Sequence, residues 1–166
     1  YRGDEMDETR NVLVESARIA RGQIKNLREL HVGDFDALII PGGFGVAKNL
    51  SDFAISGPLC SVQGDVLNAT QSFAKAGKPV GLMCIAPALA AKIFGQGVQC
   101  TIGSDHETAT ALQQMGALHV ESTVEDIVVD QTHKLVTTPA YMLAGSISEA
   151  AAGINKLVDR VLEMVG

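Results

Sequence analysis

The stretch KPVGLMCIAP, residues 78–87, places a cysteine between a short apolar run and a segment typical of a helix. The run 79–83 has the length of a buried strand, and 86–94 is rich in Ala and Leu, with Pro87 where a first-turn proline is tolerated. Cys84 is therefore predicted on a sharp strand-to-helix corner, like the serine of a nucleophile elbow. The start of a helix favours an anion and so the reactive thiolate. The alternative is a small buried residue without chemistry, since free cysteines are often buried.

Strands and helices alternate on both sides of this corner. Continuous apolar runs such as 37–40 are typical of parallel strands covered on both faces. The alternation predicts an α/β domain with a mainly parallel sheet. The other expected strands are 24–27, 99–102 and a hairpin of 127–130 with 134–138. The expected helices are 8–21, capped by Thr9 or Asp7 and ended by Gly22, then 62–76, 87–94, 106–115 and 146–165.

Composition excludes several classes of function. The chain has 166 residues and a net charge of −6, and its 13 Lys and Arg residues form no basic run, which argues against nucleic acid as a partner. The longest apolar stretch, 80–94, is interrupted by Gly81, Pro87 and Lys92 and is too short to span a membrane. Three cysteines without CxxC spacing indicate neither a disulfide framework nor a metal site. We expect a cytoplasmic protein that needs no cofactor and no metal.

The start of the chain is unusual for an α/β domain. The chain opens at Tyr1 and passes from a polar segment, 2–9, directly into a predicted helix. A domain of this class commonly begins with a buried strand, and none is predicted before residue 24. We therefore expect residues 1–166 to form a single domain that lacks its first strand.

Several polar or glycine-rich segments fall where predicted strands end. In open α/β sheets, ligands bind beyond the carboxyl ends of the strands, so these segments are expected to form one site. The glycines of 41–45 lack both nucleotide-binding patterns, GxGxxG and GxxxxGK[ST]. A glycine N–H together with the Ile85 N–H would make an oxyanion hole, and the alternative is a tight turn that needs positive φ. The segments are 41–45, Cys84, 103–106 and 137–140.

The general acid or base is less clearly marked. His106 follows a strand end and is the best candidate among the four histidines, with a solvated helix start as the alternative. Ser104 lies two residues nearer the strand and is an alternative occupant of the site. The Thr138 hydroxyl is a candidate to hold a substrate oxygen, or else it closes a turn.

Four strings resemble the ElbB-type glyoxalases of the class I glutamine amidotransferase-like superfamily, which also holds the PfpI peptidases and the parkinsonism-associated deglycases. The resemblance implies a flavodoxin-like three-layer sandwich with Cys84 as nucleophile, and with the Gly43 and Ile85 N–H groups as its oxyanion hole. It also implies a homodimer that converts glyoxal to glycolate, and methylglyoxal to lactate, without a cofactor. The strings are ETRNVLVESARIARG (8–22), DALIIPGGFGVAKNLSDFA (36–54), GKPVGLMCIAPALAAKIF (77–94) and DIVVDQTHKLVTTPAYMLA (126–144).

The chain departs from its resembled families in ways that leave a second function open. Family members carry an acidic residue after their first strand, and this chain begins beyond that region. The deglycases have a histidine about where Ser104 stands, and here His106 is displaced from that position by two residues. A peptidase would need a Cys–His pair, and the serine at position 104 argues against one. The alternative is a non-catalytic redox-sensing or metabolite-binding module of the same fold.

Overall fold

The computed structural model describes residues 7–165, which divide into two compact units. The first unit ends at Leu30 and the second begins at His31. Each unit is described separately below. Within residues 7–165, no helix combines the length and the apolar character needed to cross a bilayer.

The first unit contains one α-helix, α1 (Val12–Ile19), and one 3₁₀ turn, η1 (Leu27–Glu29). The helix is shorter than predicted because Asn11, rather than Thr9 or Asp7, caps it: the Asn11 side chain accepts a hydrogen bond from the Val14 N–H at 3.2 Å. Gly22 follows the helix end with φ +83°, as expected of a terminating glycine. The predicted strand at 24–27 is wrong, since Asn26 caps the 3₁₀ turn there.

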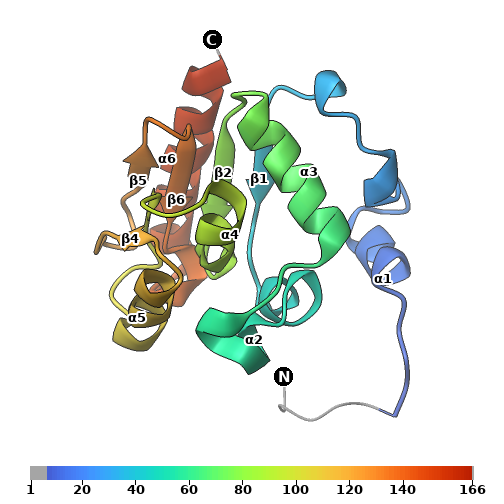
Figure 1. Cartoon of the computed structure of the whole chain (residues 1–166), viewed down its shortest axis with the longest axis horizontal. Helices are drawn as coiled ribbons and strands as arrows, with labels where there is room; N and C mark the ends of the chain where they lie inside the picture. Colours follow the sequence, from blue (N-terminus) through green and yellow to red (C-terminus); the bar gives the residue numbers. More distant parts are fainter. Residues whose placement is uncertain (1–6, 166) are drawn as a thin grey trace. The chain divides into compact units, whose positions relative to one another are not determined.

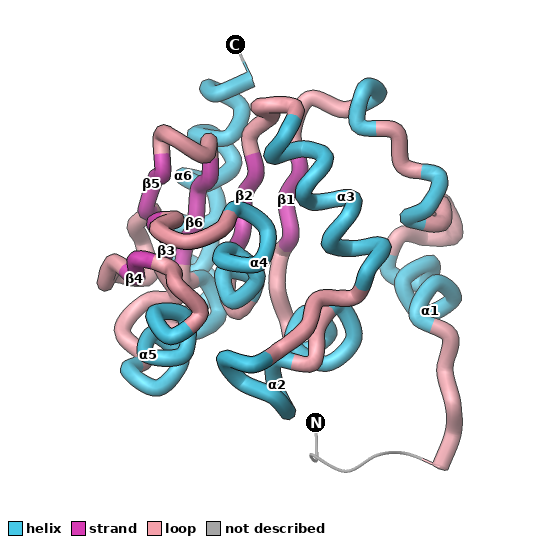
Figure 2. The backbone as a smooth tube through the Cα atoms, viewed as in Figure 1, coloured by secondary structure: helices cyan, strands magenta, loops and turns pink. Residues whose placement is uncertain are grey.

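The second unit is built on a four-stranded sheet in the order β1-β2-β6-β5 (Figure 2). β1, β2 and β6 are parallel, and β5 pairs antiparallel with β6 in the predicted hairpin. The three parallel strands are the apolar runs of the sequence, now buried on β2 and β6. The bounds are β1 (Leu38–Ile40), β2 (Val80–Met83), β5 (Val128–Asp130) and β6 (Leu135–Thr138).

A second, two-stranded parallel sheet joins β3 (Gln99–Cys100) to β4 (Leu118–His119). β3 is shorter than the predicted 99–102 because the Thr101 N–H donates to a side chain, the Thr137 hydroxyl of β6 at 2.9 Å, instead of to a backbone carbonyl of a paired strand. The Gln99 N–H likewise donates to the Asp130 carboxylate at the end of β5, at 2.9 Å. Two side chains therefore hold the small sheet to the large one.

Asp130 is 6% exposed, and its carboxylate also accepts from His133, with Nδ1 at 2.8 Å from Oδ2. Burial raises the pKa of this carboxyl, but the hydrogen bonds from the Gln99 N–H and from His133 outweigh burial, and the pKa lies below its usual value. His133, in the turn between β5 and β6, is half-buried and paired with Asp130.

Helices cover both faces of the large sheet, with α3 and α4 on one face and α6 on the other (Figure 1). α6 packs closely on β2 because Gly81 has no side chain: a Cβ there would lie 2.7 Å from Leu157 Cδ2. The predicted α/β fold with a mainly parallel sheet is confirmed. The helices are α2 (Phe53–Ser56), α3 (Gly64–Lys75), α4 (Ala90–Phe94), α5 (His106–Gln114) and α6 (Ile147–Val165), with 3₁₀ turns η2 (Val32–Asp34), η4 (Gly57–Leu59), η5 (Ala86–Leu89) and η6 (Ala140–Met142) and a π-helix, η3 (Val46–Leu50).

Two of these helices differ in detail from the sequence prediction. The helix after the cysteine starts as the 3₁₀ turn η5 and becomes α-helical only at Ala90. α3 begins two residues later than predicted, because the Gln63 side chain accepts a hydrogen bond from the Val66 N–H at 2.9 Å and caps the helix there.

Candidate active site at Cys84

Cys84 lies directly after β2 with φ +60°, a left-handed backbone conformation that costs a non-glycine residue about 1–3 kcal/mol. The neighbouring strand holds it there, since the Cys84 N–H donates to the Thr138 carbonyl at 3.1 Å. The predicted sharp corner is therefore present. Strain of this kind persists where the surrounding structure fixes the backbone and is frequent at functional sites.

The glycine loop after β1 packs against the corner. Gly42 has φ +93°, and a Cβ on it would lie 2.6 Å from the Met83 carbonyl oxygen and 2.7 Å from Cys84 Cβ. No side chain fits this approach. Gly42 is thus needed both for its conformation and for the contact that supports Cys84.

Gly43 and Ile85 line the same pocket as Cys84, so the structure brings the three residues together. Gly43 has φ +83°. Among the residues that the structure describes, no acceptor receives the backbone N–H of Gly43 or of Ile85. Two donors beside a nucleophile are the arrangement that stabilises the oxyanion of a tetrahedral adduct.

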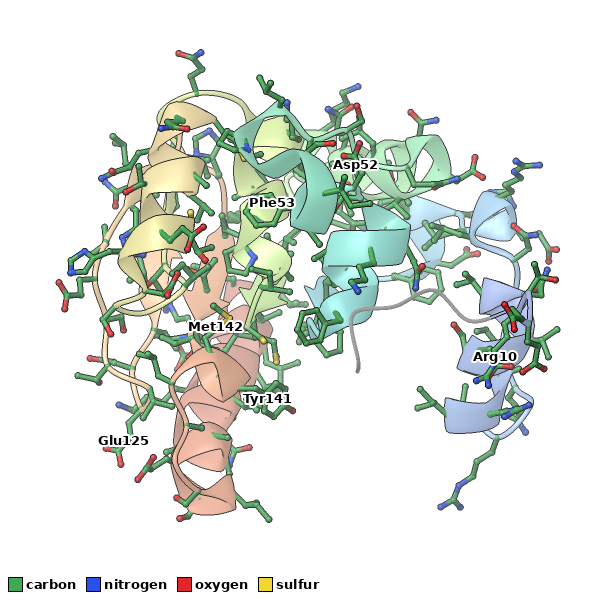
Figure 3. All side chains as sticks on the ribbon, turned by 90° about the horizontal axis from the view of Figure 1, so that it is seen from below. Arg10, Asp52, Phe53, Glu125, Tyr141 and Met142 are labelled. Atoms are coloured by element: carbon green, nitrogen blue, oxygen red, sulfur yellow. The ribbon has the colours of Figure 1, made fainter. Side chains whose placement is uncertain are left out.

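The pocket has a volume of about 650 Å³ and apolar walls. Phe53 and Ala54 come from α2, Tyr141 and Met142 from η6, and Figure 3 labels three of these side chains. Cys84 is only 7% exposed, whereas Phe44 and Tyr141 are exposed, so we infer that the thiol lies at the floor and the aromatic rings at the rim. The full lining is Gly43, Phe44, Ala47, Phe53, Ala54, Cys84, Ile85, Tyr141 and Met142.

Ala47 belongs to the π-helix η3, whose irregular turn is held by a side chain: the Ser51 hydroxyl donates to the Val46 carbonyl at 2.7 Å. Single π turns inside proteins occur frequently at functional sites. Here the turn places a small residue, rather than a bulky one, on the pocket wall.

No carboxylate, imidazole or amine lines the Cys84 pocket within the described residues. His106 and Ser104 are exposed, and neither belongs to this lining. The residues after His106, Glu107 and Thr108, line a separate pocket of about 590 Å³ that shares only Phe53 and Ala54 with the first. The structure therefore does not bring the predicted acid/base candidates to the pocket.

Thr138 is fully buried, and its hydroxyl donates to the Asp126 carbonyl at 2.8 Å. Its side chain is absent from the pocket lining, although its carbonyl holds Cys84. Its contacts are those of a residue that supports the corner through its backbone, rather than those of a substrate ligand. Within residues 7–165 no cluster of His, Cys, Asp and Glu side chains could hold a metal ion.

The other two cysteines are buried away from this pocket. Burial raises the pKa of Cys100 to about 12, with a further contribution from the Asp130 carboxylate, and burial also raises the pKa of Cys60. Both thiols are at most 1% exposed.

Iodoacetamide is therefore expected to label Cys84 at least about tenfold faster than Cys60 or Cys100 in the folded protein, since thiol reactivity follows access and thiolate fraction. Mass spectrometry of the digested protein after timed labelling measures the three rates. The unfolded protein in urea is the control and should label all three alike. Equal rates in the folded protein would contradict this description of the site.

His119, on β4, has a structural partner rather than a catalytic one. Its Nε2 accepts from the Ile102 N–H at 3.3 Å, and burial lowers its pKa, with Glu121 opposing the shift in part. The folded protein thus binds a proton at His119 less readily than the unfolded chain does. His119 therefore contributes to the free energy of unfolding at pH values above the usual histidine pKa of 6.5, and this contribution is lost as the pH falls below it.

Urea unfolding at pH 7.5 and at pH 5.0 tests this point. We expect the free energy of unfolding to fall between the two pH values in the wild type, and to fall less in His119→Gln, whose amide oxygen can accept the Ile102 N–H but does not titrate. An equal loss in both proteins would mean that another group is responsible.

Comparison with known proteins assigns the chain to a family. Residues 16–144 match the DJ-1/PfpI family. The chain belongs to this family. A crystal structure of an isoprenoid biosynthesis protein with amidotransferase-like domain from Ehrlichia chaffeensis superposes on the DJ-1/PfpI chain with a TM-score of 0.89 and 33% identity, covering 98% of this chain and 75% of the other. The Rapid Encystment Protein of Francisella tularensis shares the fold at 14% identity and a TM-score of 0.61, covering 86% of this chain and 63% of the other.

Longer relatives are known from animals. The DJ-1/PfpI chain is 47% identical to the human "Glutamine amidotransferase-like class 1 domain-containing protein 3, mitochondrial" and 32% identical to the zebrafish "ES1 protein, mitochondrial", over 96% and 81% of this chain. It spans 62% and 56% of their lengths. The prediction of a cytoplasmic protein is wrong by this comparison, because these relatives are named as mitochondrial.

Sequence reasoning missed the walls of the pocket in this DJ-1/PfpI chain. Phe53, Tyr141 and Met142 follow no periodic pattern and lie in short helices that the sequence did not predict. A usable signal existed for Tyr141 and Met142, which directly follow the strand end 137–140 already assigned to the site. Phe44 sits inside the glycine loop and carried the same signal.

Proposed function

We propose that this DJ-1/PfpI chain carries the nucleophile and oxyanion hole of a cofactor-independent glyoxalase of the ElbB type. The observation that supports this most is Cys84 held at φ +60° in a pocket that also contains the backbone N–H groups of Gly43 and Ile85, neither of which has an acceptor among the described residues. A thiol in such surroundings is suited to add to a carbonyl carbon.

The first step forms a bond between the Cys84 sulfur and one aldehyde carbon of glyoxal. The carbonyl π electrons move to oxygen, where the Gly43 and Ile85 N–H groups stabilise the charge until a proton makes the hemithioacetal. The former aldehyde C–H then loses its proton while the neighbouring carbonyl oxygen gains one, which gives an enediol. The neighbouring carbon gains a proton and the hemithioacetal oxygen loses its own, which gives the thioester of glycolate. Water cleaves the thioester, releases glycolate and restores the thiol.

The proton transfer between the two carbons needs an acid/base, and the described pocket lining contains no carboxylate, imidazole or amine for this role. We propose that this group lies outside the stretch that the chain shares with its longer relatives, in keeping with the acidic residue implied by the resemblance. The chain alone would then form the hemithioacetal, and turnover would require the additional segment. A homodimer and a single domain over residues 1–166 belong to the same proposal.

The test follows glyoxal consumption and glycolate formation without glutathione in heavy water. Two proteins are compared: this chain, and this chain extended at its N-terminus by the corresponding segment of the human relative. We expect turnover in the extended form, with solvent deuterium in the glycolate CH₂ group as the mark of proton transfer. No glycolate from an extended form that folds and in which Cys84 is still readily alkylated would overturn the proposal.

The second candidate, a redox-sensing or metabolite-binding module, is favoured by one observation: among the described residues, the pocket lining holds a thiol but no carboxylate, imidazole or amine. In that case peroxide would convert Cys84 to sulfenic acid, a product that dimedone traps, with no glycolate formed by either protein. Glycolate formation that depends on Cys84 would exclude a purely non-catalytic role.

A further inference from the structure

The Cys84 pocket is larger and more apolar than glyoxal chemistry requires. Glyoxal is a two-carbon, strongly hydrated molecule, whereas the pocket has a volume of about 650 Å³. Its largest wall residues are Phe44, Phe53, Tyr141 and Met142. Sites lined in this way gain binding energy from the apolar surface that they remove from water, which glyoxal scarcely offers.

The described lining of the pocket also contains no charged side chain. No Asp, Glu, Lys, Arg or His side chain lines it within residues 7–165, so a charged substituent would find no partner there. Lys48 does not line the pocket, but its ammonium lies over the Phe44 ring, 5.8 Å from the ring centroid. That contact engages the charge with the aromatic face.

We propose that the pocket selects carbonyl compounds in which the reactive aldehyde carries an uncharged apolar or aromatic substituent, such as an aryl α-oxoaldehyde. This inference rests on the proposed function for the reaction itself. The aldehyde carbon reaches Cys84 at the floor, and the substituent packs between the rim rings of Phe44 and Tyr141. Offset or edge-on contact between rings adds to the area that is buried.

The same lining argues against glutamine as a substrate. Glutamine presents an α-ammonium and a carboxylate, and both would lose their water without gaining an oppositely charged partner in the pocket. The pocket therefore discriminates by removing polar substituents from water, as well as by accommodating apolar ones.

A series of alkylating agents tests the selection without any need for turnover. Each agent forms the Cys84 S–C bond and expels iodide, so the chemistry is constant and only the substituent changes. After normalisation to the rate with glutathione, N-benzyl-iodoacetamide is expected to alkylate Cys84 at least about tenfold faster than iodoacetamide, as one buried apolar group gives. Iodoacetate should react no faster than iodoacetamide.

Variants at the rim locate the effect. Tyr141→Ala should reduce the benzyl preference by at least about threefold, whereas Tyr141→Phe, which keeps the ring, should retain it. Ile55→Ala is the matched control, since Ile55 is 85% exposed on the same helix as Phe53 but does not line this pocket. An unchanged preference in Tyr141→Ala, or a preference for iodoacetate, would overturn the proposal.

Turnover then extends the test to substrates. In the extended form that produces glycolate, phenylglyoxal should have a kcat/KM at least about tenfold above that of glyoxal, and above that of 4-carboxyphenylglyoxal. A benzyl preference without turnover would refute the glyoxalase and leave the apolar selection standing. Glyoxal turnover without a benzyl or phenyl preference would refute the selection alone.

Discussion

Cys84→Ser is expected to lower glyoxal turnover by more than about 10³-fold, a loss typical of removing a catalytic nucleophile. Serine is close in size to cysteine and should keep the corner, so the loss is chemical. A serine hydroxyl needs a neighbouring base to become nucleophilic, and the described pocket lining contains no carboxylate, imidazole or amine, whereas thiols in general ionise far more readily than hydroxyls. The measurement is glycolate formation by the extended form, with and without the substitution.

Cys60→Ala is the control for this result. Cys60 is buried and does not line the pocket, so its loss should leave turnover within about twofold of the wild type once the folded fraction is matched by circular dichroism. Turnover that persists in Cys84→Ser would assign the reaction to another group and remove the main support for a glyoxalase.

Gly42→Ala is expected to lower the free energy of unfolding by about 2–4 kcal/mol, because the new Cβ meets backbone and side chain at once and φ +93° is unfavourable for alanine. The clash partners are the Met83 carbonyl oxygen and Cys84 Cβ, at 2.6 and 2.7 Å. Relief requires the corner itself to move. We therefore also expect slower alkylation of Cys84, and urea unfolding together with labelling kinetics measures both effects.

Gly43→Ala provides a matched comparison for stability. Gly43 has nearly the same conformation, φ +83°, but a Cβ there would have no neighbour within 4 Å. Only the conformational cost of about 1 kcal/mol remains. If the two variants lost equal stability, the close approach of the glycine loop to Cys84 would contribute nothing measurable.

The sheet could be predicted from the sequence because its strands are continuous apolar runs. These strands can be recognised without knowing their partners, because the apolar residues of each segment already indicate a buried strand. They are the runs 37–40 and 79–83 and the hairpin. The segment 24–27 has some strand-forming residues but no strand to pair with, and Asn26 favours a capped turn instead. Local propensity is decisive only where tertiary structure provides a partner.

In the candidate site, too, some positions could be predicted from neighbouring residues and others depend on distant contacts. Cys84 and Ile85 could be placed at the corner because its conformation depends on adjacent residues, which the sequence displays in order, whereas the choice of Gly43 came from the family resemblance. The polar candidates His106 and Thr138 were chosen for lying near strand ends. Where their side chains go is decided elsewhere: the Thr138 hydroxyl is held by a carbonyl twelve residues away, and His106 begins an exposed helix. Long-range contacts of this kind cannot be predicted from a single sequence.

The separation between a fixed corner and loop-built walls has a consequence for how this fold diversifies. The strained cysteine depends on buried contacts between strands, where most substitutions are costly, whereas Phe44 and Tyr141 are 78% and 61% exposed. Mutations at these rim positions change which molecules reach the thiol at little cost in stability. Under the proposed function, substitutions in the loops would exchange one substrate for another while Cys84 and its backbone stay the same.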